Sequence, residues 1–160
     1  MSYIAEKLRE HSSALVRLNR QDQLKRMGGK VAERDADKRK VRLELGTDPE
    51  TGAKVLSPWL RVQSMSAGAF KAFVLPSIGE QMYMESAGGV VGADSMATFG
   101  AFDDEIKHPA QDTDELVFEN GSSRFSMKSG EIKVKSGNTE FKFTPGGFVG
   151  AATQFDWNQA

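Results

Sequence analysis

Histidine and cysteine, two residue types often used in catalysis and metal binding, are sparse in this 160-residue chain, which has two histidines and no cysteine. The lack of cysteine excludes disulfides, thiolate ligands and thiol nucleophiles. His108 stands in an acidic stretch, where an imidazole beside carboxylates could act as a general acid or base. An exposed linker has the same composition, and we adopt that interpretation. The neighbouring carboxylates belong to Asp103, Asp104, Glu105, Asp112, Asp114 and Glu115.

Three further patterns fall short of a functional site. Asp35-Ala36-Asp37 resembles half of a calcium loop but lacks the glycine and the distal glutamate of such a loop. The glycine-rich stretch 88–92 lacks the Lys-Ser or Lys-Thr ending of a phosphate-binding loop. Ser12, Ser66 and Ser86 lack the setting of a nucleophile elbow. We therefore predict no enzymatic activity, no cofactor and no metal ligand.

Metal binding on a symmetry axis is one alternative that the sequence leaves open. Three copies of His108 could surround an ion in a trimer, although no second ligand stands nearby. Neither His108 nor the other histidine, His11, has a second histidine two residues away that could act as a further ligand.

Overall composition favours a soluble, mainly β protein. The 21 basic and 22 acidic residues nearly balance, so no strong field attracts nucleic acid or an acidic surface. Sixteen glycines indicate many tight turns. No run of residues resembles a signal peptide or a membrane-spanning helix, and we expect synthesis in the cytoplasm.

The first 28 residues predict an amphipathic helix. Ile4, Leu8, Leu15 and Leu18 are spaced to share one helical face, and Gly28-Gly29 provides a stop signal. The apolar stripe is narrow and the remainder is charged. We therefore predict a helix that docks on a partner protein through those four residues.

Residues 29–102 predict a small β-barrel. In the segment 40–45, Val41, Leu43 and Leu45 alternate with charged residues, which is typical of a half-buried strand. Segment 30–34 precedes it across a turn, and several further short strands follow. Strands of this number and length fit an OB-like barrel.

After a linker over 103–116, residues 117–160 predict a different β-structure. Short apolar–polar–apolar triplets recur every seven to nine residues and are punctuated by Gly121, Gly130 and Gly137. One chain cannot bury so short a set of strands, whereas three intertwined copies can. The residues predicted to form the trimer core are Phe125, Met127, Ile132, Val134, Phe141 and Phe143. Ser126, Lys133 and Lys142 are expected to face solvent.

Several short motifs, in order, resemble the phage baseplate assembly protein V family. They are the stretches 29–35 (GKVAERD), 41–45 (VRLEL), 57–60 (SPWL), 76–81 (PSIGEQ) and 88–89 (GG). The resemblance implies an OB-fold domain, a C-terminal triple-stranded β-helix and a parallel homotrimer. It also implies a central spike of a contractile tail in the virion, attached to a baseplate hub and driven through the host outer membrane. The predicted partner of the N-terminal helix is then that hub.

The chain departs from better-known members of that family at its end. Those carry a His-x-His pair that gathers an iron ion on the axis, and this sequence has none. It ends instead with Phe148, Phe155 and Trp157. We expect these aromatic residues to bind a separate small tip protein, with folding back onto the trimer's own last strands as the alternative.

A second class of function also fits the predicted barrel. OB folds commonly bind oligonucleotides or carbohydrates, so the chain could be such a binding module with an oligomerising tail. Lys and Arg interleaved with aromatic residues would be expected on the barrel, and the central strands show little of this. We therefore favour the structural spike, without a nucleic-acid partner.

Overall fold

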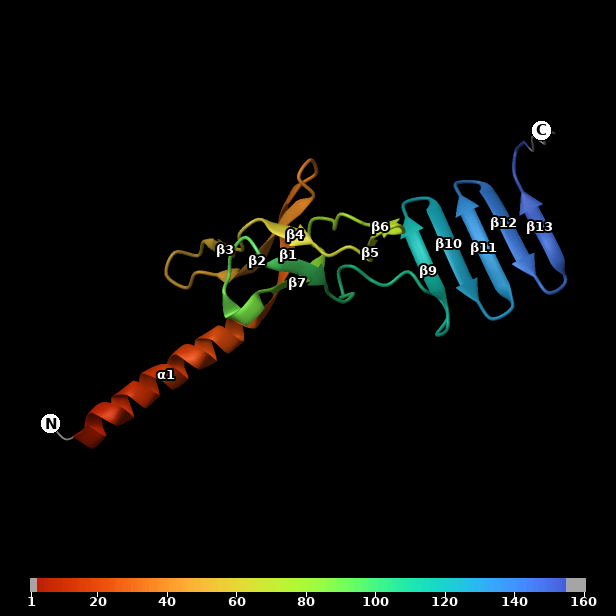
Figure 1. The fold of residues 1–160 in the computed structure, drawn as a ribbon. Helices are drawn as coiled ribbons and strands as arrows, with labels where there is room; N and C mark the ends of the chain where they lie inside the picture. The colour runs from red at the N-terminus through yellow and green to blue at the C-terminus, as the bar shows by residue number, and fades with distance from the viewer. Residues whose placement is uncertain (1–2, 155–160) are drawn as a thin grey trace. The chain divides into compact units, whose positions relative to one another are not determined.

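The computed structural model describes residues 3–154. The chain forms two compact units, Met1–Ile106 and Lys107–Ala160, which are described separately below. Figure 1 shows a helix and a group of crossing strands in the first unit, and a row of neighbouring strands in the second.

Helix α1 (Tyr3–Lys25) runs directly into strand β1 (Arg26–Asp35). Gly28 and Gly29 were expected to end the helix, and this expectation is wrong, because both lie inside β1 and pair with Tyr83 and Met82. A Cβ atom at Gly29 would collide with the carbonyl oxygen of Glu44 on the next strand. These glycines therefore permit a close approach of strands.

The last turns of α1 contact the rest of the unit. They pack against β1, strand β7 (Gln81–Glu85) and above all the 3-10 turn η1 (Ala87–Gly89). The amide of Ser86 donates a hydrogen bond to the carbonyl of Lys25 at 2.9 Å. No residue of α1 is buried.

Five strands close into a barrel. Besides β1 and β7, these are β2 (Lys40–Thr47), β4 (Leu60–Val62) and β8 (Met96–Phe99). They follow the order β1-β7-β8-β4-β2, and β2 pairs back onto β1. Strands β4 and β8 run parallel, and the other neighbours run antiparallel. This OB-like arrangement confirms the predicted barrel.

The barrel core comes from alternating residues of those strands. Val41 and Leu43 point inward on β2, as their alternation with charged residues predicted. The buried residues of the whole barrel core are Val31, Val41, Leu43, Leu60, Val62, Met82, Met84 and Ala97.

Three short strands lie outside the closed barrel. Strand β3 (Lys54–Leu56) extends the sheet beyond β2. Strands β5 (Ser66–Ala67) and β6 (Lys71–Ala72) form a separate two-stranded ribbon.

The second unit contains one antiparallel meander. Its strands are β9 (Leu116–Asn120), β10 (Ser123–Lys128), β11 (Glu131–Ser136), β12 (Thr139–Thr144) and β13 (Gly147–Ala151). Each strand pairs with the next through a two-residue loop. Gly121, Gly130 and Gly137 occupy three of these loops with positive φ, which other residues adopt only with strain. The predicted triplets lie in β10, β11 and β12, while the three-chain β-helix stays a prediction.

Candidate self-association surfaces

One face of the β9–β13 sheet is continuously apolar. Residues directly opposite each other on antiparallel strands share a face, so the pairing register defines rows across the sheet. One row consists of Phe118, Phe125, Val134 and Phe141. The adjacent row consists of Leu116, Met127, Ile132, Phe143 and Phe148. We call these nine residues the apolar face.

Much of the apolar face is exposed in a single chain. Phe118 is 54 % exposed, Phe148 52 % and Phe143 49 %. Neighbouring rings on this face contact one another: the ring centroids of Phe118 and Phe125 lie 6.2 Å apart, and those of Phe143 and Phe148 lie 4.9 Å apart. Large apolar surface of this kind usually marks an interface between proteins.

All six residues predicted for the trimer core lie on the apolar face. The structure adds Leu116 and Phe118, which the sequence reasoning missed although Leu116-Val117-Phe118 has the same apolar-x-apolar pattern. It also adds Phe148, whose ring stacks on that of Phe141 at a centroid distance of 5.6 Å. The role of these residues in a trimer stays a prediction.

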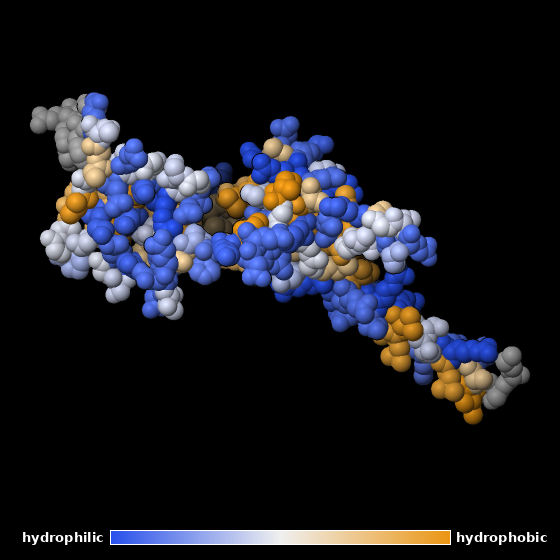
Figure 2. All heavy atoms as spheres, turned by 180° about the vertical axis from the view of Figure 1, so that it is seen from behind, coloured by the Kyte–Doolittle hydropathy of each residue, from blue (hydrophilic) through white to orange (hydrophobic). Residues whose placement is uncertain are grey.

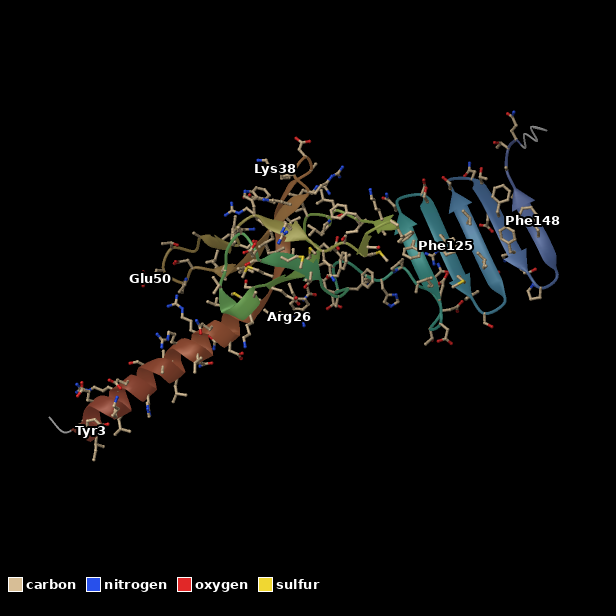
Figure 3. The ribbon with its side chains drawn as sticks, viewed as in Figure 1. Tyr3, Arg26, Lys38, Glu50, Phe125 and Phe148 are labelled. Atoms are coloured by element: carbon tan, nitrogen blue, oxygen red, sulfur yellow. The ribbon has the colours of Figure 1, made fainter. Side chains whose placement is uncertain are left out.

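Phe148 was predicted to contact a tip protein. It lies on the edge strand β13, and its side chain is on the same face of the sheet as the predicted trimer core. Figure 3 labels Phe125 and Phe148 on this sheet. Phe155 and Trp157, the other two residues of that prediction, lie outside the described residues.

The opposite face of the sheet is charged. Lys133 and Lys142 lie there, paired with Glu140 at 3.7 Å and with Glu131 at 2.7 Å. Figure 2 shows mainly hydrophilic side chains over this part of the chain. We call this side the charged face.

Ser126 on the charged face was expected to be exposed, and this expectation is wrong, because the side chain is 6 % exposed. Residues 107–115, which we call the strap, have several contacts with this face. Lys128 pairs with Asp112 at 2.6 Å. Arg124 donates to the carbonyl of Pro109 at 3.0 Å and to Glu115 at 3.0 Å. The strap, which is the second part of the predicted linker 103–116, is therefore bound to the sheet of its own unit.

Glu115 is the most strongly perturbed acid at this contact. The backbone amide of Gln111 donates to its carboxylate at 2.8 Å, and Arg124 and Ser126 also hydrogen bond to it. Because all three contacts favour the charged form, the pKa of Glu115 falls from its ordinary 4.5 to about 2. Arg124 is held from the other side by Glu119 at 2.8 Å.

The predicted docking stripe lies along α1. Leu8, Leu15 and Leu18 are each at least 60 % exposed, and Ile4 is 67 % exposed. Figure 2 shows apolar side chains at intervals along the helix. The assignment of these four residues to a hub protein stays a prediction.

The aromatic residues of the barrel that lie near basic ones are already engaged. The Arg42 guanidinium lies 5.8 Å from the Trp59 ring centre but also pairs with Glu33 at 3.3 Å. The Arg26 guanidinium lies 4.0 Å from the Tyr83 ring centre, and its Nε is 3.6 Å from Oε1 of Glu85. A stacking platform for nucleic acid needs free basic groups beside open rings. These contacts give the oligonucleotide-binding alternative no support.

The chemical motifs of the sequence are used structurally. Asp35 Oδ1 accepts a hydrogen bond from the amide of Lys38 at 2.8 Å and so closes a turn. Gly89, in the glycine-rich stretch, lies against the backbone of Gln21. Among residues 3–154, no group of three or more His, Cys, Asp or Glu side chains is placed to hold a metal ion.

Comparison with protein families agrees with the barrel topology. Residues 27–97 match the model of the type VI secretion system/phage-baseplate injector OB domain. This part of the chain is similar to the OB domain of that family. The resemblance to the phage baseplate family inferred from the motifs is thereby confirmed, and the match indicates a baseplate-associated structural role.

The match to the injector OB domain stops at residue 97 and leaves α1 and the β9–β13 sheet outside it. No curated protein matches the chain. Over the described part of the chain, no helix is long and apolar enough to cross a membrane.

Proposed function

We propose that the protein is the central spike of a contractile tail or related injection particle, and that it works as a parallel homotrimer. The observation that carries this proposal is the apolar face of the β9–β13 sheet. It presents nine large apolar side chains, many of them about half exposed, in a unit whose described part holds no second β-layer. A sheet with one apolar face needs another apolar surface to cover it.

Three copies of the sheet can cover one another around a threefold axis. Their apolar faces then form a shared core, and their charged faces form the outside of a shaft. Burial stabilises the assembly by about 1.5–3 kcal/mol for each large apolar side chain that leaves water. The intertwined β-helix implied by the family resemblance is one such arrangement, in which the edge strands β9 and β13 also find partners in neighbouring chains.

A shaft of this kind suits the transmission of an axial load. The load is distributed over the backbone hydrogen bonds of many short strands and over a dry core. We therefore propose that the spike, carried in the virion, crosses the host outer membrane when the sheath contracts. The baseplate hub is the proposed partner of α1, and a small tip protein is the proposed partner of the C-terminal aromatic residues.

A matched pair of substitutions on β11 tests the trimer. Ile132 lies on the apolar face and Lys135 on the charged face, and both are exposed in a single chain. In a monomer, Ile132→Asp and Lys135→Asp would therefore have similar, small effects. In the proposed trimer, Ile132→Asp places three carboxylates in an apolar core and prevents assembly.

Sedimentation of both variants distinguishes the two cases. We expect the Lys135→Asp protein to sediment as a trimer and the Ile132→Asp protein as a monomer or an aggregate. Equal trimer formation by both variants would overturn the proposal.

A further inference from the structure

Four apolar residues of α1 and His11 follow a seven-residue repeat. Ile4, Leu8, His11, Leu15 and Leu18 are separated by alternating steps of four and three residues. Such alternation has a period of 3.5 residues, and a strict repeat of this period marks a helix that winds around another helix.

We call the row formed by Ile4, Leu8, His11, Leu15 and Leu18 the seam. It ends where the helix meets its own barrel. The next two positions of the repeat hold Asp22 and Lys25, which pair with each other at 2.9 Å. At the same level Gly89 of η1 contacts the backbone of Gln21. The last turns of α1 are therefore occupied by intramolecular contacts, and the turns before them present the seam.

The positions beside the seam are suited to close helix packing. In heptad notation, Leu8 and Leu15 take position a, and Ile4, His11 and Leu18 take position d. The flanking e and g positions hold Ala5, Lys7, Ser12, Ala14, Asn19 and Gln21. Only Lys7 among them is charged, and it pairs with Glu10 on its own helix at 2.7 Å. The other charged side chains between Ile4 and Gln21 lie at b, c and f, away from the seam.

We propose that α1 forms a parallel three-stranded coiled coil with the α1 helices of two further copies of this chain. This inference rests on the proposed trimer, which brings three copies of α1 into one assembly. It extends the interface beyond the β9–β13 sheet. In this arrangement Leu8, Leu15 and Leu18 contact the α1 helices of the other two copies. A hub protein would then bind the outer, charged side of the bundle.

His11 is the one polar residue within the seam. In a parallel and in-register bundle, three His11 side chains meet at one level. A single polar layer of this kind fixes register and orientation at a cost in stability. Any other register would place His11 against leucine, which leaves its ring nitrogens unsatisfied.

Single cysteines test the bundle in the full-length protein, because the natural chain has none. Leu18→Cys places a thiol in the seam, and the control Arg17→Cys places one on the outer side of the same turn. Each purified protein is treated with a short bismaleimide and run on a denaturing gel, and its native mass is measured by light scattering. We expect a covalent dimer band from Leu18→Cys, since two of three chains can be linked, and little from Arg17→Cys.

A second pair of variants tests the bundle without replacing Leu18. Leu8→Asp should lower the helical circular dichroism signal of the purified protein, whereas Arg9→Asp should leave it unchanged. The native mass should stay that of a trimer in both, because the sheet still holds the chains together.

The outcomes separate this inference from the proposed function. A trimer without preferential cross-linking at position 18, and with equal helicity in both Asp variants, would overturn the coiled coil and leave the spike intact. That result would also point to a hub protein as the occupant of the stripe. A monomeric protein without cross-links would overturn both proposals.

Discussion

Nη2 of Arg124 on β10 lies 3.0 Å from Oε1 of Glu115 at the end of the strap, and both side chains are largely buried, at 18 % and 8 % exposed. Through this pair and the bond from Arg124 to the Pro109 carbonyl, the strap is held on the charged face of the sheet in its own unit. The acidic linker thus has a defined place in the fold.

Removal of the guanidinium should release the strap. In an Arg124→Gln protein, Glu115 loses an ionic partner and Pro109 loses a hydrogen-bond donor. We expect trypsin cleavage after Lys107 to become several-fold faster while the native mass stays unchanged. Lys135→Gln, on the same face but away from the strap, serves as the control. Equal cleavage rates in the two variants would contradict the structural role of Arg124.

The depressed pKa of Glu115 makes the attachment of the strap depend on pH. The carboxyl binds a proton less readily in the folded protein, at about 2, than in an unfolded chain, at 4.5. Its stabilising contribution is therefore fully present above about pH 4.5 and is lost as the pH falls through about 2. An NMR titration of the Glu115 carboxyl carbon should give a midpoint near 2 in the natural protein.

The same titration checks the cause of the shift. The Gln111 amide is the largest contributor and Arg124 the next. The midpoint in Arg124→Gln should therefore rise only part of the way to 4.5. An unshifted midpoint in the natural protein would show that the strap is not held as described.

Sequence patterns predicted the barrel and the position of the tail strands because both depend on local alternation. Val41 and Leu43 alternate with charged residues on β2 and are buried as expected. Gly28 and Gly29 were misassigned because a glycine pair signals a helix end as readily as a close approach of strands. The distinction depends on Glu44, a residue distant in sequence.

The burial of Ser126 and the attachment of the strap could not be predicted for a related reason. Charged linkers are normally solvated, and the contacts of Arg124 with Glu115 and Pro109 join residues that share no local pattern. Leu116 and Phe118, by contrast, carried a readable signal in their spacing.

Gly89 should be the glycine that is most sensitive to substitution near α1. Its φ is +73°, and a Cβ atom would collide with the backbone of Gln21. Gly89→Ala should lower the free energy of unfolding by about 1–2 kcal/mol because of the left-handed conformation. It should lower it further because the new Cβ atom displaces α1. Gly88→Ala, with φ +61° and open space around it, should cost only the first of these.

Thermal unfolding of the two glycine variants separates strain from collision. We expect a clearly larger fall in melting temperature for Gly89→Ala than for Gly88→Ala. Equal falls would mean that α1 is not packed on η1 as the structure shows.

Replacement of His11 by leucine should stabilise the helical bundle. The substitution fills a polar layer of the proposed coiled coil with apolar groups, each of which contributes about 1.5–3 kcal/mol when buried. The melting temperature of the helical circular dichroism signal should rise by several degrees. Arg17→Leu, outside the seam, should change it little. A lower or unchanged melting temperature in His11→Leu would count against the bundle.

The native mass of the purified full-length protein tests the central claim most directly. Light scattering after size-exclusion chromatography gives that mass without assumptions about molecular shape. We predict three times the 17.5 kDa of one chain, independent of concentration across the micromolar range. A mass of 17.5 kDa, with the apolar face of the β9–β13 sheet left uncovered, would contradict the proposed spike.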